Sequence, residues 1–180
     1  MVRERNVYRF DYYALLFFLA SFAGWLWEVA LHVFTEHRFV NRGIYEGPYL
    51  PIYGVGGLLL CLLFRSLQKK PVKVFFYSAL VCGVLEYVSG MFLEYKWGLR
   101  WWDYSGHFLN IHGRVCLLGT VAFGMGGTLL ICLVLPWYGK IYGKIPEKWR
   151  NLLWVALTLL FVADGAWCAM HPNMGSGIAY

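Results

Sequence analysis

The chain is organised around Asn41-Arg-Gly-Ile-Tyr-Glu-Gly-Pro-Tyr-Leu-Pro-Ile-Tyr-Gly54, a polar, turn-rich loop with long apolar runs on both sides. A second segment of the same kind, residues 100–114, lies between the next two apolar runs. Irregular backbone at membrane depth is tolerated only where it is buried in protein or lines a cavity. The two segments therefore predict structured caps at the ends of a helical bundle.

The composition is that of a membrane protein. Of the 180 residues 59% are hydrophobic and 14% are charged, whereas a soluble domain carries about 25% charged residues. The nine Trp and thirteen Tyr suit two aromatic belts at the membrane interfaces. The net charge of +6 does not indicate nucleic-acid binding, because the basic residues occupy short segments between apolar runs. The lipid bilayer is the predicted partner.

Five apolar segments approach the length of about 20 residues that a membrane-spanning helix needs. The predicted helices cover residues 11–35, 51–68, 72–95, 114–136 and 150–170. Pro51 suits a first helical turn, and the third helix is expected to begin after Pro71. Pro136 and Pro172 are expected to end helices. The predicted fold is an all-α polytopic bundle of five transmembrane helices that forms a single integral membrane domain, residues 1–180.

The distribution of Lys and Arg predicts the orientation. Eleven of the 16 basic residues fall in the N-terminal segment, which includes Arg3 and Arg5, and in the connectors 65–73 and 137–150. The positive-inside rule then places the N-terminus in the cytoplasm and both polar loops and the C-terminus outside. The predicted location is a cell membrane.

An internal repeat is expected at a displacement of 59 residues. It aligns Tyr45 with Tyr104 and Gly54 with Gly113, along with several apolar positions. This pattern predicts two parallel helix–loop–helix hairpins, residues 17–64 and 76–123, followed by a separate fifth helix. Chance similarity between apolar segments is the alternative explanation.

Acidic residues inside the predicted helices are candidates for a binding site. A charged side chain at mid-membrane costs roughly 2.5–3.5 kcal/mol on insertion scales, so it is expected to face the protein interior or a wet cavity. Glu28 and Glu86 lie at similar depth and are predicted to bind a substrate, an ion or a proton, or else to be structural carboxylates. Glu94 is predicted to be solvated. Asp164 is predicted to be either functional or the mark of a helix break at Gly165.

The two loops supply the opposite charge and further polar groups. The guanidinium groups of Arg42, Arg100 and Arg114 suit carboxylate or phosphate ligands, and the alternative is a self-neutralised structural network. The predicted binding set is completed by loop residues: Asp103, Asn41, Asn110, Tyr45 and Tyr104.

No catalytic residue, cofactor or metal site is predicted. The histidines and cysteines lack the spacing of a typical zinc site. The sequence contains no Walker A motif, so an ATP-driven process would need a separate ATPase chain. A homo-oligomer is also compatible with the sequence.

Several motifs together resemble one family. Gly24-Trp-Leu-Trp-Glu28, Gly47-Pro-Tyr-Leu-Pro-Ile-Tyr-Gly54, Trp102-Asp-Tyr-Ser105 and Asn110-Ile-His-Gly-Arg114 are similar to those of the putative ABC-transporter type IV family, the CmpB-type permeases. The resemblance covers about residues 10–135 and implies a small, multi-pass bacterial membrane protein.

Three functions follow as hypotheses. The first is a permease-like protein that binds or transports a small molecule or ion through an acid–Arg site in the outer half of the bundle. The second is a membrane-embedded enzyme that acts on a lipid or lipid-linked substrate at the outer leaflet. The third is a non-catalytic accessory or binding protein.

Overall fold

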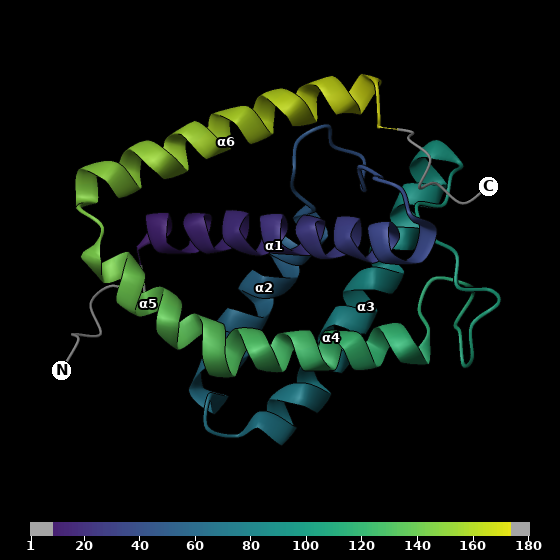
Figure 1. The fold of residues 1–180 in the computed structure, drawn as a ribbon, viewed down its shortest axis with the longest axis horizontal. Helices are drawn as coiled ribbons and strands as arrows, with labels where there is room; N and C mark the ends of the chain where they lie inside the picture. The colour runs from purple at the N-terminus through teal and green to yellow at the C-terminus, as the bar shows by residue number, and fades with distance from the viewer. Residues whose placement is uncertain (1–8, 174–180) are drawn as a thin grey trace. The chain divides into compact units, whose positions relative to one another are not determined.

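The computed structural model describes residues 9–173, which are helical apart from loops and one isolated bridge between Ile111 and Val115. The elements are α1 (Phe10–Glu36), α2 (Pro51–Phe64), a 3-10 turn η2 (Arg65–Leu67), α3 (Pro71–Trp97), α4 (Leu117–Leu129), a π-helical segment η3 (Leu130–Val134), α5 (Leu135–Lys144) and α6 (Glu147–Met170) (Figure 1). Within this part of the chain the all-α prediction is confirmed. Arg3 and Arg5, used to predict the orientation, lie outside the described residues.

Four helical stretches are long and apolar enough to cross a membrane. They are Phe10–Glu36, Pro71–Trp97, Leu117–Lys144 and Glu147–Met170. The helix at the second predicted span is shorter than these four, because it covers only Pro51–Leu67. At 1.5 Å per residue it measures about 26 Å, somewhat less than a typical hydrocarbon core. The fifth crossing therefore stays a prediction.

Apolar side chains cover the surfaces of these helices. Only 6% of the apolar window of α6 is buried within the protein, and large residues such as Leu159, Leu160 and Val162 on α6 are exposed. A surface of this kind is unfavourable in water but matches the hydrocarbon of a bilayer.

The fourth predicted helix does not end at Pro136. The helix begins at Leu117, after Cys116 caps it by accepting a hydrogen bond from the Gly119 amide at 3.4 Å, and continues to Lys144. Proline normally breaks a helix because it has no N–H and clashes with the preceding turn. Here η3 lies directly before it, and Leu135 donates to the carbonyl of Leu130, five residues back. We infer that this wider π turn accommodates Pro136.

The described residues form two compact units. Unit 1 contains residues 9–58 and 136–173, and unit 2 contains residues 59–135.

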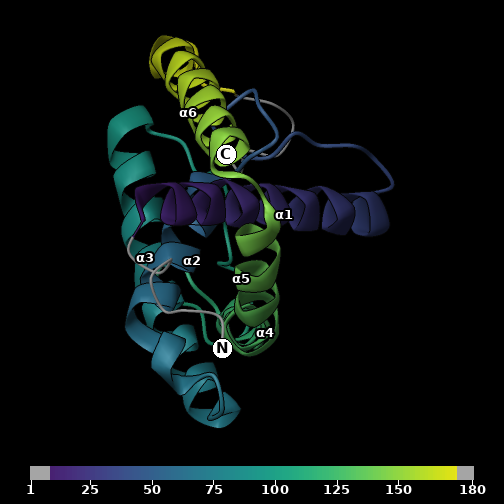
Figure 2. The same ribbon diagram turned by 90° about the vertical axis from the view of Figure 1, so that its left-hand side faces the viewer.

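In unit 1, α1 is in contact with α6 and with the first turn of α2. The chain that leaves α1 rises to α6 before it enters α2 (Figure 1 and Figure 2). The two helices α1 and α2 meet closely at glycines, since a Cβ on Gly54 would lie 2.2 Å from Ser21 Oγ and one on Gly24 would lie 2.2 Å from the ring of Tyr53. These two positions require glycine for the helices to approach.

In unit 2, α3 and α4 pack along one another. Again a buried serine of the first helix meets a glycine of the second, because a Cβ on Gly127 would lie 2.3 Å from Ser78. A Cβ on Gly124 would likewise overlap the ring of Phe75, at 2.7 Å. Small residues thus set the distance between the helices in both units, as in other membrane helix pairs.

Candidate functional site

Glu28 lies on α1, one turn beyond Gly24. Because Gly24 has no side chain, Tyr53 from the first turn of α2 lies flat against α1, and its hydroxyl donates to Glu28 Oε1 at 2.6 Å. The helix crossing therefore positions a phenol hydroxyl on a carboxylate inside a candidate membrane span.

Arg42 from the first loop lies beside the same carboxylate. Its Nε is 3.8 Å from Glu28 Oε2, and the two side chains remain 12% and 21% exposed. This separation exceeds hydrogen-bonding distance. We call Glu28, Tyr53 and Arg42 the Glu28 site. Its ion pair is partly exposed.

Asn41 fixes the start of the loop to α1. Its Oδ1 accepts from Trp25 Nε1 at 2.7 Å and its Nδ2 donates to the Glu46 carbonyl at 3.0 Å. Both contacts hold the segment that carries Arg42, so Asn41 positions the arginine.

Asp164 anchors the middle of the loop to α6, which runs through Gly165 without a break. The carboxylate accepts from the Gly47 amide at 2.9 Å, from the hydroxyl of Tyr49 and from Cys168 Sγ at 3.2 Å. Burial, together with the bond to Asp164, raises the pKa of Tyr49, which favours the protonated donor. A structural role thus accounts for the contacts of Asp164.

Tyr45 extends the same anchor. Its ring stacks on Phe161 of α6, with centroids 5.0 Å apart and planes at 12°. Burial raises the pKa of Tyr45 as well. Tyr45 therefore joins the loop to α6 rather than contacting Glu28.

Glu86 occupies a more enclosed place in unit 2. Only 4% of the residue is exposed, and its Oε1 accepts from the Tyr104 hydroxyl at 3.1 Å. Tyr104 comes from the second loop, so each unit pairs a glutamate of a candidate membrane span with a tyrosine hydroxyl.

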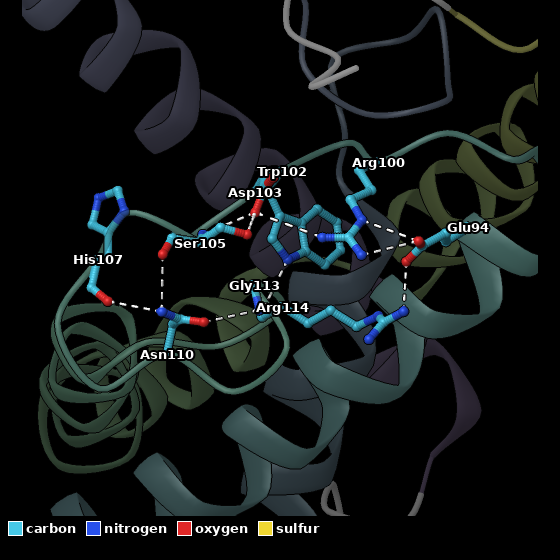
Figure 3. Close-up of polar contacts among 9 residues, drawn as sticks. All are labelled: Glu94, Arg100, Trp102, Asp103, Ser105, His107, Asn110, Gly113 and Arg114. Atoms are coloured by element: carbon cyan, nitrogen blue, oxygen red, sulfur yellow. Dashed lines mark hydrogen bonds and ion pairs between the residues drawn. The ribbon is translucent and has the colours of Figure 1, made fainter.

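The arginines of the second loop form ion pairs with Glu94, not with Glu86 (Figure 3). Arg100 donates through Nε to Glu94 Oε1 at 3.1 Å, and Arg114 donates through Nη2 to Oε2 at 2.5 Å. Glu94 was predicted to be solvated, and its side chain is 30% exposed although the loop folds back over the last turns of α3. Arg100 Nη1 also lies 3.7 Å from Asp103, so two acids balance two bases.

The remaining residues of this loop bond to one another (Figure 3). Asp103 accepts from the amide and the hydroxyl of Ser105 at 2.8 and 2.5 Å, and these bonds lower its pKa. Asn110 donates to the carbonyls of Ser105 and His107 and accepts from the Gly113 amide. The second loop is thus held by its own polar groups.

Gly113 is the tightest point of this loop. It has φ +68, and a Cβ there would lie 2.5 Å from Asp103 Oδ1 and 2.6 Å from Ser105 Oγ. Gly113→Ala should lower the free energy of unfolding by about 1–3 kcal/mol, because it adds backbone strain and displaces Asp103. Denaturant titration of the detergent-solubilised protein measures the loss. Gly106→Ala in the same loop, where a Cβ meets nothing within 4 Å, is the control, and an equal loss in both variants would contradict this account.

The structure brings together part of the predicted set in each unit. Glu28 and Arg42 adjoin in unit 1, and Asn41 orients the loop there. In unit 2 Glu86 meets Tyr104, while Arg100 and Arg114 meet Glu94. Sequence reasoning did not select Tyr53, although a tyrosine just before Gly54 in the opening stretch was a usable signal. Among the described residues, no three His, Cys, Asp or Glu side chains converge as metal ligands would.

The long apolar helices and their apolar surfaces define a membrane protein. The chain belongs to the family described as "Putative ABC-transporter type IV", whose model matches residues 15–169. The match extends beyond the region that carries the motif resemblance and includes α6. No curated protein and no solved structure matches the chain.

Proposed function

We propose that this chain is a permease-like membrane protein in which the Glu28 site binds a small molecule or ion. The observation that carries the proposal is the state of Glu28: its carboxylate lies within a candidate membrane span, is 21% exposed and has Arg42 at 3.8 Å. A charged side chain in a membrane helix is energetically costly, and such residues commonly mark substrate or ion pathways.

The chemistry of the Glu28 site suits a small polar ligand. The carboxylate accepts from a cationic or hydrogen-bond-donating group, and the guanidinium binds an anionic one. Tyr53 holds one carboxylate oxygen at 2.6 Å, which leaves the second oxygen on the side of Arg42. A ligand with both kinds of group, or a proton together with an anion, would replace the long contact between Glu28 and Arg42.

We assign a supporting role to the second loop. Its two arginines and one acid, Arg100, Arg114 and Asp103, are neutralised together with Glu94 at the end of α3. Glu86, with Tyr104 above it, is almost fully enclosed. Under this proposal Glu28 and Arg42 bind ligand, while Asn41 and Tyr45 hold the first loop. The predicted residues of unit 2, including Asn110, hold the cap.

The internal repeat is part of the proposal. In each predicted hairpin a buried serine of the first helix, Ser21 or Ser78, meets a glycine of the second. Each hairpin also pairs a glutamate with a tyrosine hydroxyl. The second loop is longer, because α4 begins at Leu117 rather than at the position that a displacement of 59 residues from Pro51 gives.

The membrane topology and partners follow as further parts of the proposal. An N-terminus in the cytoplasm and a C-terminus outside require Pro51–Leu67 to complete a fifth crossing. The family description favours a separate ATPase chain as partner. A bacterial cell membrane and a homo-oligomer are compatible with it.

A stability screen tests the binding role. The purified protein is heated in the presence of single solutes: amino acids, dicarboxylates, polyamines and alkali-metal chlorides. A ligand at 100 times its Kd stabilises the folded state by about 2.7 kcal/mol, so a binding solute should raise Tm. The shift should disappear in Glu28→Gln and shrink in Tyr53→Phe.

Glu86→Gln is the matched control, since it removes the same charge from the enclosed site. It should retain the solute-induced shift even if its starting Tm is lower. A shift that survives in Glu28→Gln and vanishes in Glu86→Gln would contradict the assignment.

A further inference from the structure

Unit 2 contains an apolar groove that shares no residue with the Glu28 site. It has a volume of about 720 Å³ and runs between the start of α3 and the end of α4 with η3. Its wall is formed by Pro71, Val72 and Phe75 from α3 and by five residues of the facing helix: Met125, Thr128, Leu129, Cys132 and Leu133. The hydroxyl of Thr128 donates to the Gly124 carbonyl at 2.8 Å, so the groove presents almost only apolar surface.

The π-helical segment shapes this groove. Cys132 and Leu133 belong to η3, where the wider turn displaces side chains from the positions of a regular α-helix. Such segments often occur at functional sites. The contacts of Gly124 with Phe75 and of Gly127 with Ser78 hold the two helices together next to it.

Basic residues lie next in sequence to the α3 residues that line one end of the groove. Lys70 directly precedes Pro71, Lys69 comes just before it, and Lys73 follows Val72; all three lysines are exposed. Residues 47–85 contain no Asp or Glu, and residues 117–135 contain no charged residue at all. Within the described part of unit 2, none of the three lysines forms an ion pair.

We propose that this groove binds an anionic phospholipid, with an acyl chain along α3 and α4 and the phosphate at Lys69, Lys70 and Lys73. The charge distribution selects the class of ligand, because an apolar groove flanked in sequence by lysines without ion pairs complements a molecule with a long tail and a negative head. Basic pockets beside membrane helices bind anionic headgroups in this way. The lipid belongs to the leaflet on the side of the α2–α3 connector, which the positive-inside rule predicts to be cytoplasmic.

Native mass spectrometry of the whole chain in detergent tests the proposal. Phosphatidylglycerol and phosphatidylcholine with identical acyl chains are titrated separately, and bound lipid is counted. The wild type should bind phosphatidylglycerol at least tenfold more tightly. The triple variant Lys69→Gln/Lys70→Gln/Lys73→Gln should lose about 100-fold in affinity, since each basic residue near the headgroup contributes about 1 kcal/mol, or roughly fivefold.

Two comparisons distinguish lipid binding at a defined site from general electrostatic attraction between basic residues and an anionic lipid. The variant Lys140→Gln/Lys144→Gln/Lys148→Gln removes the same charge from the other basic connector and should keep the affinity within about twofold. Cys132→Trp fills the groove while leaving every lysine in place and should also lose bound phosphatidylglycerol. Circular dichroism and Tm establish that each variant is folded.

Equal binding of the two lipids by the wild type would overturn the proposal. So would an equal loss in the two lysine triples, or full retention of phosphatidylglycerol in folded Cys132→Trp. None of these outcomes bears on solute binding at Glu28, which is measured separately.

Discussion

Asp11→Ala should lower the free energy of unfolding by about 3–5 kcal/mol, the largest loss we expect from a single substitution. Asp11 is 4% exposed at the start of α1 and accepts from the Tyr142 hydroxyl at 2.6 Å and from Arg9 Nε at 3.1 Å. Arg150 of α6, which is 7% exposed, has its Nε 3.6 Å away. Removing the acid leaves a buried guanidinium without its counter-charge, which is the costly way to break such a pair.

Chemical denaturation in detergent, followed by circular dichroism, measures the effect. Glu147→Ala is the control, because Glu147 also pairs with Arg9, at 2.6 Å, but has a side chain 60% exposed. An exposed ion pair contributes little, so that variant should resemble the wild type. If the two variants were equally stable, the buried cluster would not hold α1, α5 and α6 together.

Asp164→Ala should release the first loop from α6 and cost about 2–3 kcal/mol of stability. The carboxylate binds the Gly47 amide at 2.9 Å, the Tyr49 hydroxyl and Cys168, and hydrogen bonds to charged groups contribute about 1.5–3 kcal/mol each without being additive. Hydrogen exchange at the amides of Glu46 and Gly47 should accelerate at least tenfold.

Asp164→Asn keeps one acceptor oxygen and should show an intermediate acceleration. Exchange in the second loop, residues 98–116, should not change in either variant, because the polar groups of that loop bond within unit 2. Unchanged exchange at Gly47 in Asp164→Ala would show that the stacking of Tyr45 on Phe161 suffices to hold the loop.

The helices could be predicted from the sequence because apolar runs of membrane length leave few alternatives. Pro51 marked a helix start correctly, and α3 begins at Pro71, one residue before the predicted start. Pro136 misled, since the helix continues through it after a π-helical segment, Leu130–Val134, that no local sequence pattern predicts. The second predicted span is short because its helix begins at Pro51 and changes to the 3-10 turn η2 at Arg65.

The candidate site could be predicted only in part. A glutamate in an apolar run is conspicuous, so Glu28 and Glu86 were selected, and the nearby arginines followed. Which arginine meets which acid depends on how each loop folds back, and Arg100 and Arg114 reach Glu94 near the end of α3 instead of Glu86. The role of Asp164 as an anchor for the first loop likewise required the packing of α6 against that loop.

The most direct test of the central claim, that the Glu28 site binds ligand, is native mass spectrometry of the purified protein and its Glu28→Gln and Glu86→Gln variants, with small molecules and ions retained from the membrane counted in each. We predict that Glu28→Gln folds with a Tm close to that of the wild type and loses a bound small species, whereas Glu86→Gln keeps it. A folded Glu28→Gln variant that retains every species carried by the wild type would contradict the claim.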